Sequence, residues 1–167
     1  MKGESAVSVD NVKTHLQAFG LAEKIQTFAV SSATVELAAA ALGVAGERIA
    51  KTLSIYAGER VLLIVCAGDA RLHNRKFKFR FSAKPKMLSV EELEEKVGHQ
   101  IGGVCPFGVR EGVEVYLDQS LLRFETVFPA CGEANNAIEL TPKRLFEVAG
   151  AKEWVDVCKL PGEDPAF

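Results

Sequence analysis

Residues 48–67 read RIAKTLSIYAGERVLLIVCA, and this stretch decides the fold. Its first half, residues 48–56, alternates apolar and polar residues, which is typical of a β-strand. Gly58-Glu59-Arg60 then forms a turn, and residues 61–67 are an unbroken apolar run. A short apolar run of this kind indicates a strand that is buried on both faces. The stretch therefore predicts a central β-hairpin.

Shorter helices and strands surround this hairpin. Apolar spacing, N-cap residues and terminal glycines predict helices at 7–20 (with Asp10 as N-cap), at 35–42 (between Thr34 and Gly43), at 90–97 (opened by a Ser89–Glu92 capping box) and from Thr141-Pro142 to near Gly150. Short strands are predicted at 25–30, 113–117, 125–129 and 137–140. Strands joined by turns outnumber strand–helix–strand crossovers, so we predict the α+β class with a mixed, largely antiparallel sheet. No repeat or linker divides the chain, so residues 1–167 are interpreted as one domain with a loose tail over 160–167.

Composition narrows the class of protein. The chain has 167 residues and a formal net charge of −2, which excludes a nucleic-acid coat protein but is compatible with a local basic patch. Its longest apolar run is far shorter than the roughly 20 residues of a membrane span, and no secretory signal is visible. There is no P-loop and no dinucleotide-binding glycine motif after a strand, so no nucleotide cofactor is expected. Four scattered cysteines without a CxxC pair or a nearby His predict no metal and a reducing, cytoplasmic location.

Lys51 is an unusual residue in the first strand of the hairpin. Alternation places it on the same face as Ile49 and Leu53, which is expected to be the buried face. A buried ammonium needs an anion or a polar cavity, because an unpaired buried charge is unfavourable. The alternative is that Lys51 extends its charged end to solvent from an edge strand. The pattern alone does not separate these two interpretations.

A glycine-rich loop is the second candidate feature. It reads Ile101-Gly-Gly-Val-Cys-Pro-Phe-Gly108, and adjacent glycines allow backbone N–H groups to approach a ligand closely, as in an oxyanion hole. A plain glycine-rich turn is the alternative. Cys105 within the loop is interpreted as a structural or pocket-lining residue rather than a nucleophile, because no base adjoins it in the sequence.

Two further stretches carry polar side chains. Residues 71–86 contain seven cations and no carboxylate, with three Phe residues interleaved, which favours a nucleic-acid contact over a merely solvated face. The cations proposed to contact the nucleic acid are Arg71, Arg75, Lys76, Lys78 and Arg80. In the second stretch, Asn135 and Asn136 follow Gly132 and either orient a substrate or cap a hairpin.

Several motifs follow one another over about residues 20–155. They are Thr34-Val-Glu with Ala39 and Ala41-Leu-Gly, Ile49-Ala-Lys-Thr-Leu53, Gly68-Asp69, Gly98-His99, Gly102-Gly-Val-Cys-Pro-Phe-Gly108, Gly132 and Ile138-Glu-Leu-Thr-Pro142. Together they resemble the YbaK and prolyl-tRNA-synthetase-associated editing-domain family, whose members hydrolyse mischarged aminoacyl-tRNA. The Lys-Thr-Leu strand followed by the Gly-Gly-Val-x-Pro-Phe loop is the specific part of this resemblance.

The resemblance implies a curved sheet flanked by helices and a site without metal or covalent intermediate. Lys51 is implied to contact the terminal adenosine or its phosphate, and the loop of Gly102, Gly103, Val104, Cys105 and Pro106 to hold the ester carbonyl and the attacking water. The implied substrate-binding positions are Phe28, Thr34, Phe107, Gly132, Asn135 and Asn136. The implied partners are the acceptor end of aminoacyl-tRNA and an aminoacyl-tRNA synthetase, with no membrane and no DNA.

The leading hypothesis is therefore a free-standing aminoacyl-tRNA deacylase that acts in trans. A non-catalytic tRNA- or synthetase-binding module of the same fold is the alternative, and a thiol-dependent hydrolase using Cys105 is a third. Relatives that act on alanyl esters share a Gly-x-His motif, where this chain has Gly132-Glu133-Ala134. The amino acid that is removed is therefore not assigned by the sequence.

Overall fold

The computed structural model describes residues 2–29 and 34–163, with side chains described from residue 8 onward. The helices are α1 (Lys2–Gln17), α2 (Val35–Leu42), α3 (Asn74–Phe81), α4 (Val90–Glu92, continued by a π-helical turn over Leu93–Val97) and α5 (Pro142–Ala149). The strands are β1 (Gln26–Thr27), β2 (Ile49–Ala57), β3 (Arg60–Ala67), β4 (Arg71–Leu72), β5 (Pro85–Met87), β6 (Glu114–Asp118), β7 (Phe128–Pro129), β8 (Asn136–Ala137), β9 (Trp154–Val155) and β10 (Cys158–Lys159).

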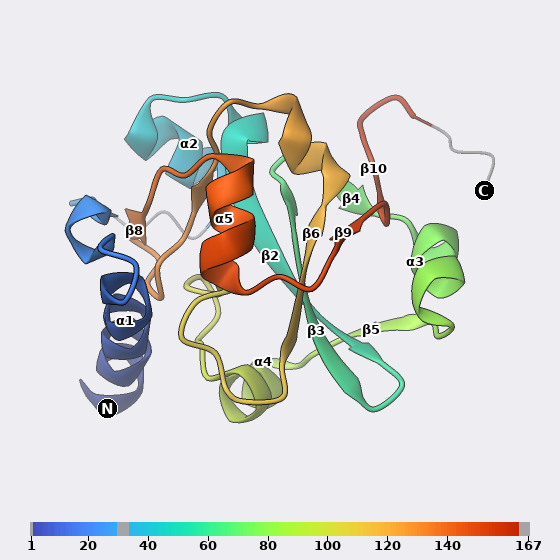
Figure 1. Ribbon diagram of the computed structural model, residues 1–167, viewed down its shortest axis with the longest axis horizontal. Coiled ribbons are helices and arrows are strands. Elements are labelled where there is room, and N and C mark those ends of the chain that lie inside the picture. The colour runs from blue at the N-terminus through green and yellow to red at the C-terminus, as the bar shows by residue number, and fades with distance from the viewer. Residues whose placement is uncertain (1, 30–33, 164–167) are drawn as a thin grey trace.

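The predicted hairpin is the centre of the molecule (Figure 1). Strands β2 and β3 pair antiparallel from Ala50 opposite Ala67 to Ala57 opposite Arg60. The main sheet has the order β5-β2-β3-β6-β9, with β7 paired to β2 on the edge that β5 also uses. Strand β5 is antiparallel to β2, whereas β6, β7 and β9 join in parallel, and β1–β8 and β4–β10 form two small antiparallel sheets. The predicted mixed, largely antiparallel α+β fold is confirmed.

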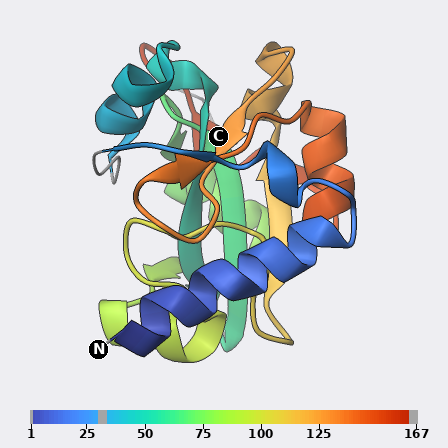
Figure 2. The ribbon, with the colours of Figure 1, turned by 90° about the vertical axis from the view of Figure 1, so that its left-hand side faces the viewer.

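The core is built where the apolar run predicted it. Residues 62–67 of β3 are all fully buried, because helices and loops cover both faces of this strand. Burying each large aliphatic side chain contributes about 1.5–3 kcal/mol, so this strand is a main source of stability. Helix α1 crosses in front of the sheet towards α5 (Figure 2). It buries Val12 and Leu16 completely, and His15 joins it to the Val148 carbonyl and to the Gly108 amide.

Local signals set most helix ends. The Thr34 and Thr141 hydroxyls accept backbone N–H groups at the starts of α2 and α5, and the capping box between Ser89 and Glu92 is present. The N-cap prediction for Asp10 is wrong: α1 already begins at Lys2, because residues 2–9 continue the helix towards the N-terminus. The predicted strand over 25–30 is only β1, and its last residue lies outside the described residues.

The basic stretch contains a helix that the sequence analysis did not predict. In α3, Phe77 and Phe81 are four residues apart and point into the core, while Phe79 remains 77% exposed. At the other end of the chain, residues 160–163 form a turn in which the Leu160 amide donates to the Glu163 carboxylate. The remainder of the predicted tail, residues 164–167, lies outside the described residues.

Candidate active site

A gap in the pairing of β2 positions the candidate site. Strand β7 pairs with Ile49 and Ala50, and β5 pairs only from Ile55 onward, so the edge of β2 at residues 51–53 has no strand partner within residues 2–29 and 34–163. A cavity of about 220 Å³ lies beside this gap, and we call it the Lys51 cavity. Its lining comes from α2, β2, the glycine loop and the segment before α5: Thr34, Val35, Ala38, Ile49, Ala50, Lys51, Thr52, Ile101, Gly102, Val104, Phe128, Ala130, Glu133, Asn136 and Ala137.

Lys51 is the cation in the wall of this cavity. Its side chain is half-buried, and Nζ donates to the Gly68 carbonyl at 3.2 Å. Gly68 itself packs so tightly that an added Cβ would lie 2.0 Å from the Gly46 carbonyl oxygen, so the acceptor is held in place by its surroundings. Lys51 also lines a second, adjoining cavity. Lys51 therefore lines a cavity, as the first interpretation expects, and lies on an edge of β2 that is unpaired among the described residues, as the second expects.

Three residues that line the same cavity carry polar groups without a partner among the described residues. Thr52 Oγ1 is buried and has no hydrogen-bond partner among the described residues, which is uncommon for a buried hydroxyl. The backbone amides of Gly102 and Val104 also donate to no acceptor within the described chain. A cavity lined by a lysine and by two loop residues whose N–H groups have no acceptor among the described residues is suited to a ligand that carries oxygen atoms.

The two adjacent glycines of the loop, Gly102 and Gly103, are required for different reasons. Gly102 has a positive φ of 90°, which favours glycine, and it lines the cavity. A Cβ on Gly103 would lie 2.4 Å from the Gly132 carbonyl oxygen, so the two loops pack backbone against backbone. Gly103 and Gly132 thus fix the position of the loop, while Gly102 and Val104 face the cavity.

The opposite side of the same loop is closed. Cys105 and His99 are fully buried; His99 Nδ1 lies 2.6 Å from Ser8 Oγ, and its Nε2 lies 2.8 Å from the Phe107 carbonyl oxygen. The carbonyl can only accept, so Nε2 carries the proton and Nδ1 accepts from Ser8. Ser8, His99 and Cys105 are called the Cys105 cluster below.

Burial sets the protonation states in this cluster. It raises the pKa of the Cys105 thiol to about 12 and raises that of the neighbouring Cys131 well above its usual range. Desolvation lowers the pKa of His99, which is therefore neutral at pH 7. His99 Nε2 does lie 3.5 Å from Cys105 Sγ, but this nitrogen already donates to Phe107. The cluster holds a neutral thiol beside a histidine with no free acceptor nitrogen, which is unsuited to forming a thiolate.

Only some of the other residues predicted for the site line the Lys51 cavity. Thr34 lines the Lys51 cavity, whereas Phe28, Phe107, Gly132 and Pro106 do not. The side chain of Asn136 lines it but is used by its own loop, with Oδ1 accepting from the Cys131 and Glu133 amides and Nδ2 donating to the Cys131 carbonyl. These bonds match the capping alternative for Asn136.

Phe28 and Asn135 form a contact beside the cavity. The Phe28 amide donates to the Asn135 carbonyl at 2.7 Å, and Asn135 Nδ2 donates back to the Phe28 carbonyl. This connects β1 to the loop before β8 and does not place either side chain in the cavity wall. Their roles in substrate binding remain predictions.

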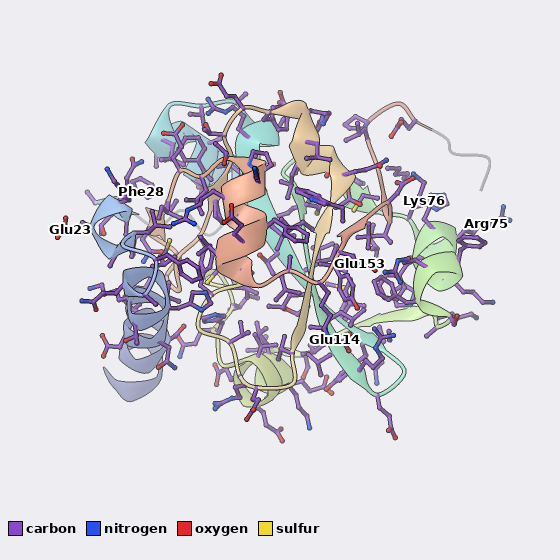
Figure 3. All side chains as sticks on the ribbon, viewed as in Figure 1. Glu23, Phe28, Arg75, Lys76, Glu114 and Glu153 are labelled. Atoms are coloured by element: carbon purple, nitrogen blue, oxygen red, sulfur yellow. The ribbon has the colours of Figure 1, made fainter. Side chains whose placement is uncertain are left out.

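The predicted tRNA-binding cations divide between β4, which carries Arg71, and α3, which carries Arg75, Lys76, Lys78 and Arg80. Arg71 lines the cavity that adjoins Lys51, but α3 lies at the end of the molecule opposite to Phe28 (Figure 3). On α3, Lys76 Nζ contacts Asp156 at 2.8 Å and Arg80 pairs with Glu153. Arg80 also lies over the rings of Phe81 and Tyr116. Two of the cations in this basic stretch, Lys76 and Arg80, are therefore paired with carboxylates of the same chain.

Two polar residues of the Lys51 cavity were not singled out from the sequence. Glu133 contributes a carboxylate to the wall and forms no side-chain hydrogen bond or ion pair with any described residue. Thr52 contributes the unpartnered hydroxyl. Thr52 follows Lys51 directly, so its place in the motif was a usable signal, whereas nothing in the sequence indicated that Glu133 faces Lys51 across a cavity.

The described residues contain neither a metal-binding cluster nor a membrane-spanning helix. Over 2–29 and 34–163, no group of three or more His, Cys, Asp or Glu side chains is arranged to hold a metal ion. In the same ranges, no helix is both long enough and apolar enough to cross a membrane.

Fold and site together define a small α+β domain with a lysine-containing cavity between its central hairpin and a glycine loop. The chain belongs to the aminoacyl-tRNA editing domain family, whose model matches residues 30–148. It is 53% identical over 154 residues to the uncharacterized protein YwhH of Bacillus subtilis (strain 168), covering 92% of this chain and 98% of that one.

Synthetases and solved structures extend this comparison. The chain is 31% identical over 142 residues to the proline--tRNA ligase of Shouchella clausii (strain KSM-K16), covering 83% of this chain but only 24% of the ligase. A crystal structure described as "a putative trans-editing enzyme for prolyl tRNA synthetase" superimposes with a TM-score of 0.83 at 29% identity, covering 91% of this chain and 97% of that one. The hypothetical protein APE2540 gives a TM-score of 0.80 at 29% identity, with 89% and 99% covered.

Proposed function

We propose that this protein hydrolyses the ester bond between an amino acid and the terminal ribose of a mischarged tRNA, acting in trans in the cytoplasm. The family and the trans-editing structural neighbour support this class of reaction. The observation that carries the proposal is that Lys51, Gly102 and Val104 line one cavity, and that the backbone amides of Gly102 and Val104 have no acceptor among the described residues.

The proposed reaction needs only water and positioning. A water oxygen adds to the ester carbonyl carbon, and the carbonyl oxygen takes the electron pair while the Gly102 and Val104 N–H groups donate to it. The tetrahedral intermediate then expels the ribose oxygen, which takes up the proton that the attacking water gives up, and the free amino acid is released. Preorganised donors of this kind contribute about 100- to 1000-fold each in enzymes of known mechanism. No covalent acyl-enzyme is formed.

Lys51 and Glu133 have complementary proposed roles. An aminoacyl ester carries an α-ammonium group, and Glu133 supplies an unpaired carboxylate in the cavity wall. Lys51 lies where the Lys51 cavity meets the adjoining one, and its ammonium is placed to attract the negatively charged nucleotide that follows the ester. The two charges would orient the substrate with its amino acid inward and its nucleotide outward.

A thiol-dependent reaction is disfavoured by the Cys105 cluster. Cys105 is fully buried, its thiol pKa is raised to about 12, and it does not line the Lys51 cavity. A nucleophilic cysteine needs access and a lowered pKa, and neither is present here.

The test is deacylation of a panel of radiolabelled aminoacyl-tRNAs carrying Ala, Cys, Ser, Thr and Pro, both on tRNA(Pro) and on the cognate tRNAs. Release of one or a few amino acids is expected, and would also reveal the specificity. No release by the folded protein across the panel, together with salt-dependent tRNA binding, would overturn the deacylase proposal in favour of a binding module.

A further inference from the structure

A second cavity opens next to the Lys51 cavity. It measures about 630 Å³, and Lys51 and Val35 belong to both walls. We call it the Arg71 cavity. Its wall comes from α2, β2, the turn after β3, β4 and the end of the chain: Val35, Glu36, Lys51, Gly68, Asp69, Arg71, Lys159, Leu160, Pro161, Gly162 and Glu163. A ligand that leaves the Lys51 cavity past Lys51 enters this space.

Two cations in this wall lie directly opposite each other. Arg71 and Lys159 are cross-strand partners in the antiparallel pair of β4 and β10. Like charges in such positions repel each other and weaken the pairing. Neither side chain forms a hydrogen bond or an ion pair within the described part of the chain. An anion between them would remove the repulsion.

The carboxylates of the cavity do not neutralise these cations. Asp69 is held by Arg123, which donates from both terminal nitrogens to the two carboxylate oxygens. Glu163 accepts the Leu160 amide at 2.6 Å, and Glu36 lies exposed in the first turn of α2. With Asp69 paired to Arg123 outside the wall, three cations face two carboxylates, which leaves one positive charge. A phosphodiester carries one negative charge, so it matches this excess.

We propose that the Arg71 cavity binds the phosphodiester group that precedes the terminal nucleoside of the substrate, with Arg71 and Lys159 contacting its oxygens. The proposal rests on the proposed function, which places the aminoacyl ester in the Lys51 cavity. Lys51 then lies between ester and phosphodiester, next to both. The single-stranded end of the tRNA runs past Lys51 towards β4 and β10, and not first across α3.

The first experiment measures binding without catalysis. A fluorescently labelled, uncharged CCA trinucleotide is titrated into the wild type, into Arg71→Gln/Lys159→Gln, and into the control Lys13→Gln/Lys143→Gln. The control removes two exposed lysines that line neither cavity. We expect the Arg71/Lys159 variant to bind about tenfold more weakly. Its salt slope should fall by about 0.7 for the lost phosphate contact. Equal weakening in the control variant would overturn the proposal.

Two further measurements distinguish a phosphodiester site from a site for free phosphate, and test the phosphate site independently of the proposed deacylase function. Competition by inorganic phosphate as strong as that by the trinucleotide would identify a free-phosphate site and overturn the assignment. With charged tRNA, the Arg71/Lys159 variant should raise KM about tenfold at nearly unchanged kcat. With an aminoacyl-adenosine, which has no phosphodiester, it should match the wild type. If no ester is cleaved by any variant, the deacylase proposal fails, while the trinucleotide titration still decides the phosphate site.

Discussion

The Lys51 cavity and the Cys105 cluster share residues 98–108 but differ in every property that matters for catalysis. Ile101, Gly102 and Val104 face the cavity, whereas His99, Cys105 and Phe107 are fully buried on the other side. The cavity has open amides and an unpartnered hydroxyl, while the polar groups of the cluster are bonded to one another or to the Phe107 carbonyl. A cysteine beside a histidine is thus part of the packing here, and the reactive surface that we propose consists of backbone and lysine.

We expect the largest effect from a substitution that disturbs the Lys51 cavity and the Cys105 cluster together. Gly103→Ala places a Cβ 2.4 Å from the Gly132 carbonyl oxygen, so one of the two loops must move. Overpacking of this kind is expected to lower the free energy of unfolding by about 3 kcal/mol, and to abolish deacylation. Urea unfolding measures the first effect. In the control Gly46→Ala, the nearest atom would be Val35 Cγ1 at an ordinary 3.5 Å, and stability should change little. Equal stability of both variants would show that the loops are not rigidly packed.

A smaller effect is expected inside the cavity alone. Glu133→Gln keeps the size of the side chain but removes the charge proposed to contact the α-ammonium of the substrate. We expect KM for aminoacyl-tRNA to rise about tenfold with kcat changed little. The matched control is Glu125→Gln, an exposed carboxylate outside the cavity. An unchanged KM in Glu133→Gln would remove Glu133 from the site.

A substitution in the Cys105 cluster should lower the stability of the protein and leave its deacylation activity unchanged. Cys105→Ala removes a buried sulfur and is expected to destabilise the protein by about 1 kcal/mol. In the native wild type all four cysteines are buried, so iodoacetamide should react with them only after unfolding. Mass spectrometry before and after denaturation checks this. Rapid labelling of native Cys105 with loss of activity would reverse the roles assigned to the two regions.

The smallest effect concerns pH. Burial lowers the pKa of His99 in the folded protein below its usual 6.5, so between these two values the unfolded chain binds more protons. The contribution of neutral His99 to stability is therefore full above pH 6.5 and is lost as the pH falls through the folded pKa. Between pH 7 and 5, His99→Gln should lose less stability than the wild type. Identical losses would mean that the pKa of His99 is the same in the folded and the unfolded protein.

The sequence predicted the parts of this molecule that local rules govern. The hairpin over 48–67 and the caps at Thr34, Ser89 and Thr141 follow from alternation and capping chemistry. The start of α1 at Lys2 was missed because Asp10 resembles an N-cap although the helix continues before it.

What the sequence could not predict depends on contacts between distant segments. His99 and Ser8 are 91 residues apart in the chain, and Arg71 and Lys159 meet only through the pairing of β4 with β10. Glu133 faces the cavity because the glycine loops pack through Gly103 and Gly132. The cations of α3 looked like a binding patch because their partners Asp156 and Glu153 come much later in the sequence.

The most direct test of the central claim is the deacylation rate of Lys51→Ala and Cys105→Ala, measured side by side on the best aminoacyl-tRNA of the panel. Circular dichroism of both variants confirms that they are folded. We predict that Lys51→Ala loses at least about 100-fold in kcat/KM, and that Cys105→Ala retains nearly the wild-type rate. Full activity in Lys51→Ala, or loss of activity in folded Cys105→Ala, would contradict the assignment of catalysis to the Lys51 cavity.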